Sequence, residues 1–284
     1  YAGNRKSVYI TGYLASSAPS GIAGMFVRDD ADTTSADNGG TVIVAANGKR
    51  WKRQYSGPVS VGWFAALDNV VDDTSAIQSI VNLAGTSDAF DGTYAKLEIA
   101  FPPKAKCYIA GTIYLPSFVR INLNGSVLRG TGSNTMFESG YFYGGVAVSN
   151  FGQPNETKFV VGSGVFNGNI LQCNTAFKLF NFCEDSAIDG IRLVGANRAV
   201  YAKRCFYGSF TRVHSRSPLD GAAFPCFHFD DAVNAIALQS NFAVGYDVGW
   251  KFSGSKDNVY AINCGAESCP TGVAVDDSTS GIQF

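Results

Sequence analysis

A repeat of about 23 residues in the C-terminal half is the feature of this sequence that most restricts its fold. Each copy begins with three residues in the order apolar–any–apolar, which is the alternation of a β-strand with one buried face. The copies begin 23, 27, 23 and 23 residues apart, at 177–179, 200–202, 227–229, 250–252 and 273–275. A second apolar cluster follows each of the first four copies. A fixed step with two or three short strands per repeat predicts a β-solenoid.

A single coil of a solenoid cannot bury its apolar face alone, so successive coils stack at the strand spacing of about 4.8 Å. Equivalent residues then form columns, and columns on the outer face build long, shallow binding surfaces. The composition suits one such core, since 46% of the 284 residues are hydrophobic, 16% are charged and 32 are glycine. The net charge of −1 gives no electrostatic footprint for nucleic acid. No apolar run approaches about 18 residues, so we expect no membrane insertion.

The residues before the repeat divide into two parts. Residues 1–65 contain short strand-like runs separated by polar turns, which predict a β-rich segment. Within it, residues 30–40 are polar enough to predict an exposed loop. Residues 49–53 (KRWKR) predict an alternating strand with a solvated basic face, with phosphate binding as the alternative. We assign residues 66–284 to the solenoid domain.

One helix is expected, at 74–85, ahead of the stacked coils. Asp72, Asp73 and Thr74 supply N-cap residues, and Ser75 and Gln78 have the spacing of a capping box. Apolar residues then recur at three- and four-residue steps, up to a glycine that can end the helix. A helix with one apolar stripe is suited to cap a solenoid, whose terminal coil otherwise exposes its core and its strand edges.

The cysteines and the two chain ends give further information about cofactors and about the extent of the protein. The seven cysteines are an odd number without metal-ligand spacing, and we interpret them as buried thiols. No metal or cofactor motif occurs, and we expect neither group. The chain begins with Tyr1 rather than Met and stops at Phe284 inside a repeat. We therefore expect a fragment of a longer protein, truncated within the solenoid at its C-terminus.

Several short motifs follow one another in an order that resembles a known family. They are WFAA at 63–66, DDTSAIQ at 72–78, FPP at 101–103, IYLPS at 113–117 and INLNG at 121–125. This order is similar to the start of the pectate-lyase-like β-helix domain of bacteriophage tailspike proteins. Residues 38–43 and 48–53 are similar to the segment that leads into that domain. The resemblance covers residues 24–130, and the repeat supports it independently beyond residue 177.

The resemblance implies an all-β chain with a right-handed, single-stranded parallel β-helix. It implies a homotrimer in the virion tail, assembled in the bacterial cytoplasm, whose N-terminal region contacts other tail or baseplate proteins. It also implies extracellular binding, and often cleavage, of bacterial surface polysaccharide during host attachment. Catalytic residues of the family share no sequence motif, so none is carried over. The calcium-site and catalytic-arginine signature of pectate lyases is not recognisable, which argues against pectate-type elimination.

The candidate catalytic residues follow from the columns instead. Hydrolysis of a glycosidic bond uses two carboxyl groups, about 5–5.5 Å apart for retention and about 6.5–9.5 Å apart for inversion. Asp230 and Asp231 follow one strand of the repeat, and Asp276 and Asp277 follow another at the same offset, two coils or about 9.6 Å away. These four aspartates are the predicted catalytic group. The alternative is that they satisfy backbone amides at turns.

The neighbouring coils supply candidates for substrate binding. Between the two aspartate pairs, the same columns hold Ser253 and Gly254, which leave room for a sugar or a water molecule. One coil earlier they hold two basic residues, for which simple ion pairs with the aspartates are the alternative role. Aromatic rings stack on the C–H faces of sugars, whereas Trp250 lies in an apolar column and is expected in the core. The predicted substrate-binding residues are Tyr201, Lys203, Arg204, Tyr207 and Tyr260.

The leading functional hypothesis is depolymerisation of capsule, exopolysaccharide or O-antigen by hydrolysis with paired carboxylates. A non-catalytic polysaccharide-binding adhesin or structural tail fibre is the first alternative. A polysaccharide lyase is the second. Serine-based deacetylation also stays open, because catalytic triads are built by geometry rather than by sequence spacing.

Overall fold

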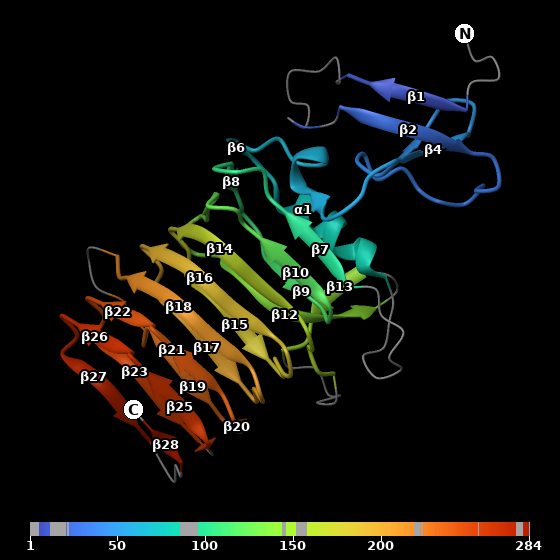
Figure 1. The fold of residues 1–284 in the computed structure, drawn as a ribbon. Helices are drawn as coiled ribbons and strands as arrows, with labels where there is room; N and C mark the ends of the chain where they lie inside the picture. Colours follow the sequence, from blue (N-terminus) through green and yellow to red (C-terminus); the bar gives the residue numbers. More distant parts are fainter. Residues whose placement is uncertain are drawn as a thin grey trace.

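The computed structural model describes residues 6–11, 21, 23–85, 96–143, 146–151, 158–218, 222, 224–254, 256–276 and 281–283. A small sheet at the N-terminal end is followed by a stack of coils that ends at the C-terminus (Figure 1). Among these residues the helical segments are α1 (Thr74–Val81) and two 3₁₀ turns, η1 (Val61–Trp63) and η2 (Asn82–Ala84). None of the described helices is long and apolar enough to cross a membrane.

The N-terminal sheet is antiparallel, and its strand order is β1-β2-β4-β3. Its strands are β1 (Ser7–Ile10), β2 (Gly24–Asp29), β3 (Val42–Val44) and β4 (Arg50–Arg53). This arrangement confirms a β-rich segment at the start of the chain. β5 (Val59–Ser60) already pairs with the sheet of the solenoid.

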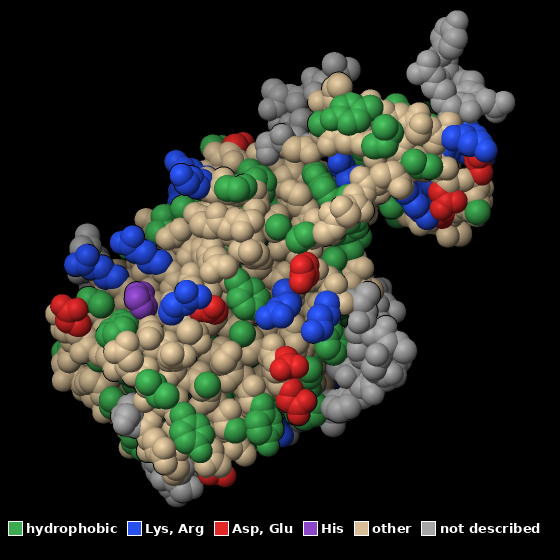
Figure 2. All heavy atoms as spheres, viewed as in Figure 1, with side chains coloured by type: hydrophobic (Ala, Val, Ile, Leu, Met, Phe, Trp, Pro, Cys, Tyr) green, Lys and Arg blue, Asp and Glu red, His purple; other side chains and the backbone are tan. Residues whose placement is uncertain are grey.

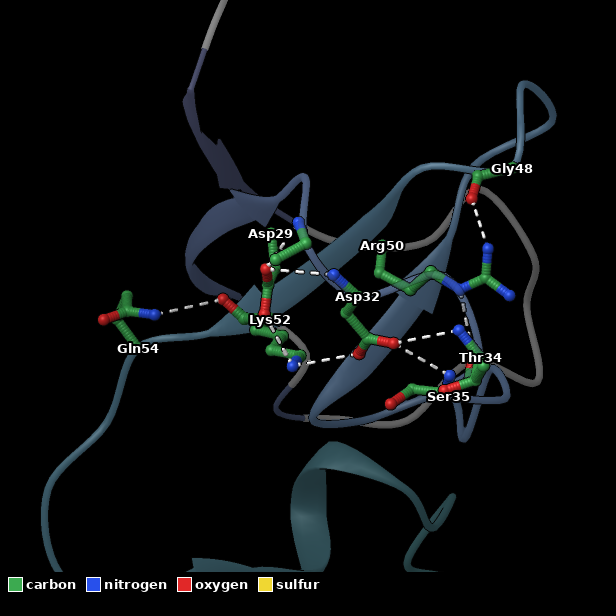
Figure 3. A network of polar contacts seen from close by, with 9 residues as sticks. Asp29, Asp32, Thr34, Ser35, Gly48, Arg50, Lys52 and Gln54 are labelled. Atoms are coloured by element: carbon green, nitrogen blue, oxygen red, sulfur yellow. Dashed lines mark hydrogen bonds and ion pairs between the residues drawn. The ribbon is translucent and has the colours of Figure 1, made fainter.

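Acidic side chains in the loop after β2 organise this sheet (Figure 3). Lys52 of β4 forms ion pairs with Asp29 at 2.7 Å and Asp32 at 2.9 Å. Asp32 also accepts the backbone amides of Thr34 and Ser35. Hydrogen bonds from Ser35, followed by the Lys52 contact, hold the pKa of Asp32 well below its ordinary range. The polar loop is largely exposed, as predicted, and its own carboxylates order it.

The basic segment 49–53 contributes β4, but the prediction of a solvated basic face is wrong for Arg53. This side chain is only 6% exposed. Its guanidinium carbon lies 4.6 Å from the ring centre of Phe26 and 4.5 Å from that of Trp63, and Nε donates a hydrogen bond to the Gly40 carbonyl. Because Trp63 belongs to η1 at the start of the solenoid, Arg53 connects the N-terminal sheet to the coils.

The coils form two large sheets and one small one, and all their described strand pairs are parallel except that of β12 with β13. The first sheet contains β5, β6 (Asp68–Asp72), β7 (Leu97–Ala100), β8 (Lys106–Tyr108), β10 (Val119–Asn122), β11 (Val127–Arg129), β14 (Gly164–Leu171), β16 (Ala187–Val194), β18 (Ser209–Arg216), β21 (Ala237–Gln239), β22 (Phe242–Val244), β25 (Val259–Ile262), β26 (Gly265–Glu267) and β28 (Ile282–Gln283). The second contains β9 (Ile113–Leu115), β12 (Thr135–Tyr143), β13 (Val146–Ser149), β15 (Thr175–Phe180), β17 (Arg198–Lys203), β19 (Phe227–Asp230), β23 (Val248–Ser253) and β27 (Thr271–Val275). The third contains β20 (Val233–Asn234) and β24 (Lys256–Asp257).

The strand register of the second sheet confirms the repeat residue by residue. Phe177, Val200, Phe227, Trp250 and Val273 are successive partners across β15, β17, β19, β23 and β27. The column also extends backward to two strands that the repeat did not reveal, β12 and β9. The step from β12 to β15 is long because the β12–β13 hairpin is inserted between them. The predicted β-solenoid is therefore confirmed.

Aromatic rings stack inside the coils along these columns. The Phe227 and Trp250 rings lie 4.1 Å apart with an angle of 10° between their planes, and the Phe229 and Phe252 rings lie 5.5 Å apart at 14°. Trp250 is 2% exposed, which confirms its predicted place in the core. Five of the seven cysteines are likewise buried. Cys264 and Cys269 of the last coils are half-buried, so the prediction of buried thiols is wrong for these two.

Left-handed backbone conformations mark the corners of the coils. One column of corners consists of Asn181, Arg204, Asp231 and Gly254, with φ between 51° and 71°. A Cβ on Gly254 would lie 2.9 Å from the Asp231 Cα, so this corner is tightly stacked as well as left-handed. A second corner column runs through Asn167, Gly190, Arg212, Ser240 and Asn263. Glycine and asparagine adopt this conformation at low cost, which accounts for part of the glycine content.

α1 covers the first coils, as predicted, and η2 and Gly85 end it. Ile77, Ile80 and Val81 are buried in the solenoid core. The predicted capping box is wrong, because Gln78 does not turn back to the start of the helix. Its Oε1 accepts the backbone amide of Tyr114 at 2.8 Å, on the open edge of β9. The side chain thus takes the place of a neighbouring strand.

We expect Gln78→Ala to lower the free energy of unfolding by about 1–2 kcal/mol, because the Tyr114 amide would lose its acceptor. Thermal and denaturant unfolding followed by circular dichroism would measure this. Gln54→Ala is the matched control, since Gln54 is exposed and contacts only the Lys52 carbonyl at 3.3 Å. Equal stabilities of the two variants would contradict the role assigned to Gln78.

The buried Asp73 predicts a pH-dependent stability. This side chain is 1% exposed, and burial raises its pKa from 3.8 to about 6. The folded state therefore binds a proton more tightly than the unfolded state, and stability falls as the pH rises from about 4 to about 6, by about 2–3 kcal/mol. Relative to the native protein, Asp73→Asn should gain stability between pH 4 and pH 7. A difference in melting temperature that is the same at both pH values would contradict this.

Candidate functional site

The outer face of the second sheet carries a continuous row of polar side chains. It lies one residue beyond the buried aromatic column, where the strand alternation turns side chains outward. In register, the row consists of Tyr114, Glu138, Lys178, Tyr201, His228, Lys251 and Ala274. We call it the outer ladder.

A second outward row lies two residues further along each strand. Lys203 pairs with Asp230, and Asp230 pairs with Ser253. Asp276 follows in the next coil, where its amide donates to the Phe252 carbonyl. Asp230 and Asp276 therefore lie in one row, two coils or about 9.6 Å apart, with Ser253 between them. The structure places these residues as the repeat spacing predicts.

Asp230 is the most strongly hydrogen-bonded carboxylate of this face. Its Oδ1 accepts the hydroxyl of Ser253 at 2.8 Å and the backbone amide of Asp231 at 2.9 Å, and its Oδ2 accepts the hydroxyl of Tyr201 at 3.0 Å. Partial burial alone would raise the pKa of Asp230, but these bonds and nearby His228 outweigh it and lower the pKa below its ordinary value. Asp230 is thus ionised at neutral pH, which is the protonation state that a general base requires.

A chain of hydrogen bonds extends from Asp230 across two coils. Ser253 donates its proton to Asp230, and His228 Nε2 lies 2.8 Å from the same Ser253 oxygen. With the serine proton directed at Asp230, the imidazole N–H is the donor toward Ser253. This arrangement connects a histidine, a hydroxyl and a carboxylate in a proton path.

The other predicted aspartates are held differently. Asp231 occupies a left-handed corner, and Lys203 lies 3.7 Å from it rather than pairing with Asp230. The alternative role of Lys203, an ion pair with an aspartate of the next coil, thus involves Asp231 and not Asp230. Asp276 forms an ion pair with Lys251 at 2.6 Å. Asp277 lies outside the described residues.

Among the predicted aromatic platforms, only Tyr201 lies beside Asp230. Its ring packs against Phe151 at 5.9 Å and His228 at 5.2 Å. Burial, together with Asp230, raises the pKa of Tyr201 to about 12, so its hydroxyl remains a donor at neutral pH. Tyr201 therefore positions Asp230 and is not suited to abstract a proton.

The remaining predicted binding residues, Tyr207, Arg204 and Tyr260, lie in a turn, at a corner and on the first sheet, respectively. Tyr207 is 61% exposed in the turn between β17 and β18. Arg204 occupies the left-handed corner after β17, and its guanidinium lies 5.9 Å from the ring centre of Phe180. Tyr260 is on β25, which belongs to the first sheet, so the structure does not bring it to Asp230. On the face visible in Figure 2, which includes strands of the first sheet, charges of both signs are dispersed among uncharged side chains.

Arg198 begins β17 and is a residue of the site that sequence reasoning missed. Its guanidinium carbon lies 4.8 Å from the ring centre of Tyr201 and 4.3 Å from that of Phe224. The only signal for it was its place at the start of a repeat strand, three residues before Tyr201. Phe151 could not be found from the repeat, because it follows the inserted hairpin.

A groove of about 910 Å³ lies at the corner of the coils where β15 and β17 begin. Its lining residues are Thr131, Gly132, Leu171, Gln172, Val194, Gly195, Asn197, Arg216, Ser217 and Pro218. One of these lining residues, Asn197, is the chain neighbour of Arg198. Among the described residues, no group of three His, Cys, Asp or Glu side chains is arranged to hold a metal ion.

Comparisons with known proteins agree with this architecture. Residues 1–56 match the model of the phage tail protein small four-stranded β-sheet domain. The tailspike protein of Acinetobacter baumannii phage AM24 superposes with a TM-score of 0.56 at 17% identity, over 97% of this chain and 51% of that protein. The tailspike protein gp49 of A. baumannii bacteriophage Fri1, a capsular polysaccharide depolymerase, matches with a TM-score of 0.47 at 13% identity, over 93% and 59% of the two chains.

The chain therefore spans about half the length of the tailspikes that it matches. Because the sequence identity is low, the superposition establishes the fold alone. The chemistry of the site must be inferred from the residues of this chain. The matched N-terminal domain coincides with the four-stranded sheet β1-β2-β4-β3. The chain thus combines a segment that matches the phage-tail β-sheet domain with a β-helix that shares the fold of the AM24 tailspike protein.

Proposed function

We propose that this chain binds bacterial surface polysaccharide and hydrolyses its glycosidic bonds at the outer face of β17, β19 and β23. The observation that carries this is Asp230, an ionised carboxylate held by three donors in one row with a second carboxylate, Asp276. The outer ladder beside it offers hydroxyl, imidazole and ammonium groups to sugar hydroxyls over several coils. Homotrimer assembly, and attachment to the virion tail through the four-stranded sheet, remain predictions of the tailspike resemblance.

The separation of the two carboxylates favours an inverting reaction. Two coils, or about 9.6 Å, are close to the upper end of the range that admits a water molecule between base and sugar. In this mechanism Asp230 accepts a proton from the water as the water oxygen bonds to the anomeric carbon. The glycosidic C–O bond breaks, and its oxygen leaves with a proton from the acid.

Asp276 is the acid in this proposal. To act, it must leave its ion pair with Lys251 and take up a proton, which substrate binding at the Lys251 ammonium would promote. Elimination is less well supported, because the raised pKa of Tyr201 keeps that hydroxyl protonated. The choice of hydrolysis thus depends on the ionised Asp230 and on the spacing of its row.

We expect Asp230→Asn to lower turnover of the cognate polysaccharide by about 10³-fold, in the range typical for loss of a general base. Release of reducing ends would measure this, with ultraviolet absorbance of unsaturated uronates as the test for elimination. Asp189→Asn is the matched control, since Asp189 pairs with Arg212 at 2.7 Å on the first sheet.

Three outcomes of this assay would contradict hydrolysis at Asp230. Undiminished turnover in Asp230→Asn would remove this residue from the mechanism. Unsaturated products would indicate a lyase. Intact binding without products of any kind would indicate an adhesin.

Serine-based deacetylation is the second candidate function, because Ser253 lies within hydrogen-bond distance of His228. If Asp230 is the base of a hydrolase, Ser253→Ala removes only one of the hydrogen bonds that Asp230 accepts. Turnover should then fall only about 10-fold. Reducing-end release and acetate release from an O-acetylated polysaccharide would be measured together. Acetate release that Ser253→Ala abolishes, with no reducing ends formed, would favour the esterase.

A further inference from the structure

Arg198 lies over two aromatic rings at the edge of the candidate site. Its guanidinium lies over both Tyr201 and Phe224, and Phe224 is 37% exposed. Contacts of this kind act on the guanidinium charge and occupy no conventional hydrogen-bond acceptor. The rings therefore hold the guanidinium in place without a carboxylate or carbonyl partner.

Arg198 forms no ion pair within the described part of the chain, although the charge of Asp230 acts on it from a greater distance. No carboxylate there lies within ion-pair distance of it, and its Nε is buried without a hydrogen-bond partner. Burial lowers the pKa of Arg198, but a guanidinium remains protonated under all physiological conditions. Other cations of this sheet have partners, as Lys178 pairs with Glu138 and Lys251 with Asp276. A partly desolvated cation whose N–H donors meet no carboxylate in an ion pair is a receptor for an anion.

The neighbouring groove has the same electrostatic character. Its ten lining residues include Arg216 and no aspartate or glutamate. Asn197, next to Arg198, is one of them, and its side chain donates to Asn174 at 3.2 Å in a ladder of amides along the corner. The groove thus holds amide groups and one cation, Arg216, and it includes the residue that precedes Arg198 in the chain.

We propose that Arg198 recognises the carboxylate of an acidic sugar, so that the substrate is a polysaccharide containing uronic or other carboxylated residues. A planar carboxylate matches the fork of a guanidinium and can accept two parallel hydrogen bonds. Tyr201 links the two parts of the site, because its ring lies beneath Arg198 while its hydroxyl donates to Asp230. The acidic sugar would therefore bind next to the bond that Asp230 attacks. This inference rests on the proposed function.

The test uses the capsular polysaccharide of a strain that the protein binds, before and after carboxyl reduction, which converts uronic acids to neutral hexoses. We expect reduction to weaken binding by at least about 10-fold, the loss of one charge-assisted contact. Added sodium chloride should weaken binding of the native polysaccharide and have little effect on the reduced one. Equal affinity for the native and reduced polysaccharides would overturn the proposal that a carboxylate is recognised. A phosphorylated glycan would give this result, because carboxyl reduction leaves its phosphate unchanged.

Variants assign the effect to Arg198. Arg198→Gln should lose the preference for the native form, and Arg198→Lys should keep part of it, since it retains the charge without the fork. Arg120→Gln is the matched control, because Arg120 also lies over a ring, that of Phe166 at 4.8 Å, but on the first sheet. If Arg198→Lys and a folded Arg198→Gln both keep the full preference for the native over the reduced polysaccharide, Arg198 is not the residue that recognises the carboxylate. If no polysaccharide, acidic or neutral, binds the native protein, the proposed function fails, and this inference with it.

Discussion

The parallel, in-register hydrogen bonding of successive coils is the constraint on which the rest of this structure depends. It places Phe227 on Val200 and Trp250 on Phe227, so residues far apart in the sequence become direct neighbours. The same register places the outward residues in rows. Core and site are thus products of one backbone ladder, and a one-residue slip would exchange the buried and exposed faces.

The backbone register also explains why charged residues of the second sheet occur in pairs. Charges one coil apart face each other, and opposite charges then pair, as Lys178 does with Glu138 and Lys251 with Asp276. Asp231 has a further constraint, since its corner requires a left-handed backbone that aspartate tolerates. For Asp231, the role of a turn residue accounts for its position without chemistry.

Sequence reasoning reached as far as the period of the repeat extends. The strand register from Phe177 to Val273 and the shared row of Asp230 and Asp276 could be predicted, because both follow from the step length alone. The β12–β13 hairpin breaks the period, so the register of the earlier coils, which only the resemblance and the assignment of residues 66–284 covered, and the position of Phe151 could not be predicted. Partner choice was also beyond reach. Gln78 bonds to a strand edge instead of its own helix, and Lys203 lies nearer Asp231 than Asp230, because side-chain rotamers decide such contacts.

Asp230 differs from the other carboxylates of its sheet in the kind of partner that holds it. Glu138 and Asp276 each face an ammonium group, which cancels their charge. Asp230 is held by two hydroxyls and one amide, which are neutral donors that stabilise the ionised form without supplying a cation. Its negative charge is therefore available to a water molecule or a reacting sugar. An aspartate with only a structural role at a turn needs only the bond to the following amide. The additional hydroxyl donors, Tyr201 and Ser253, distinguish Asp230 as a candidate catalytic residue from such a turn residue.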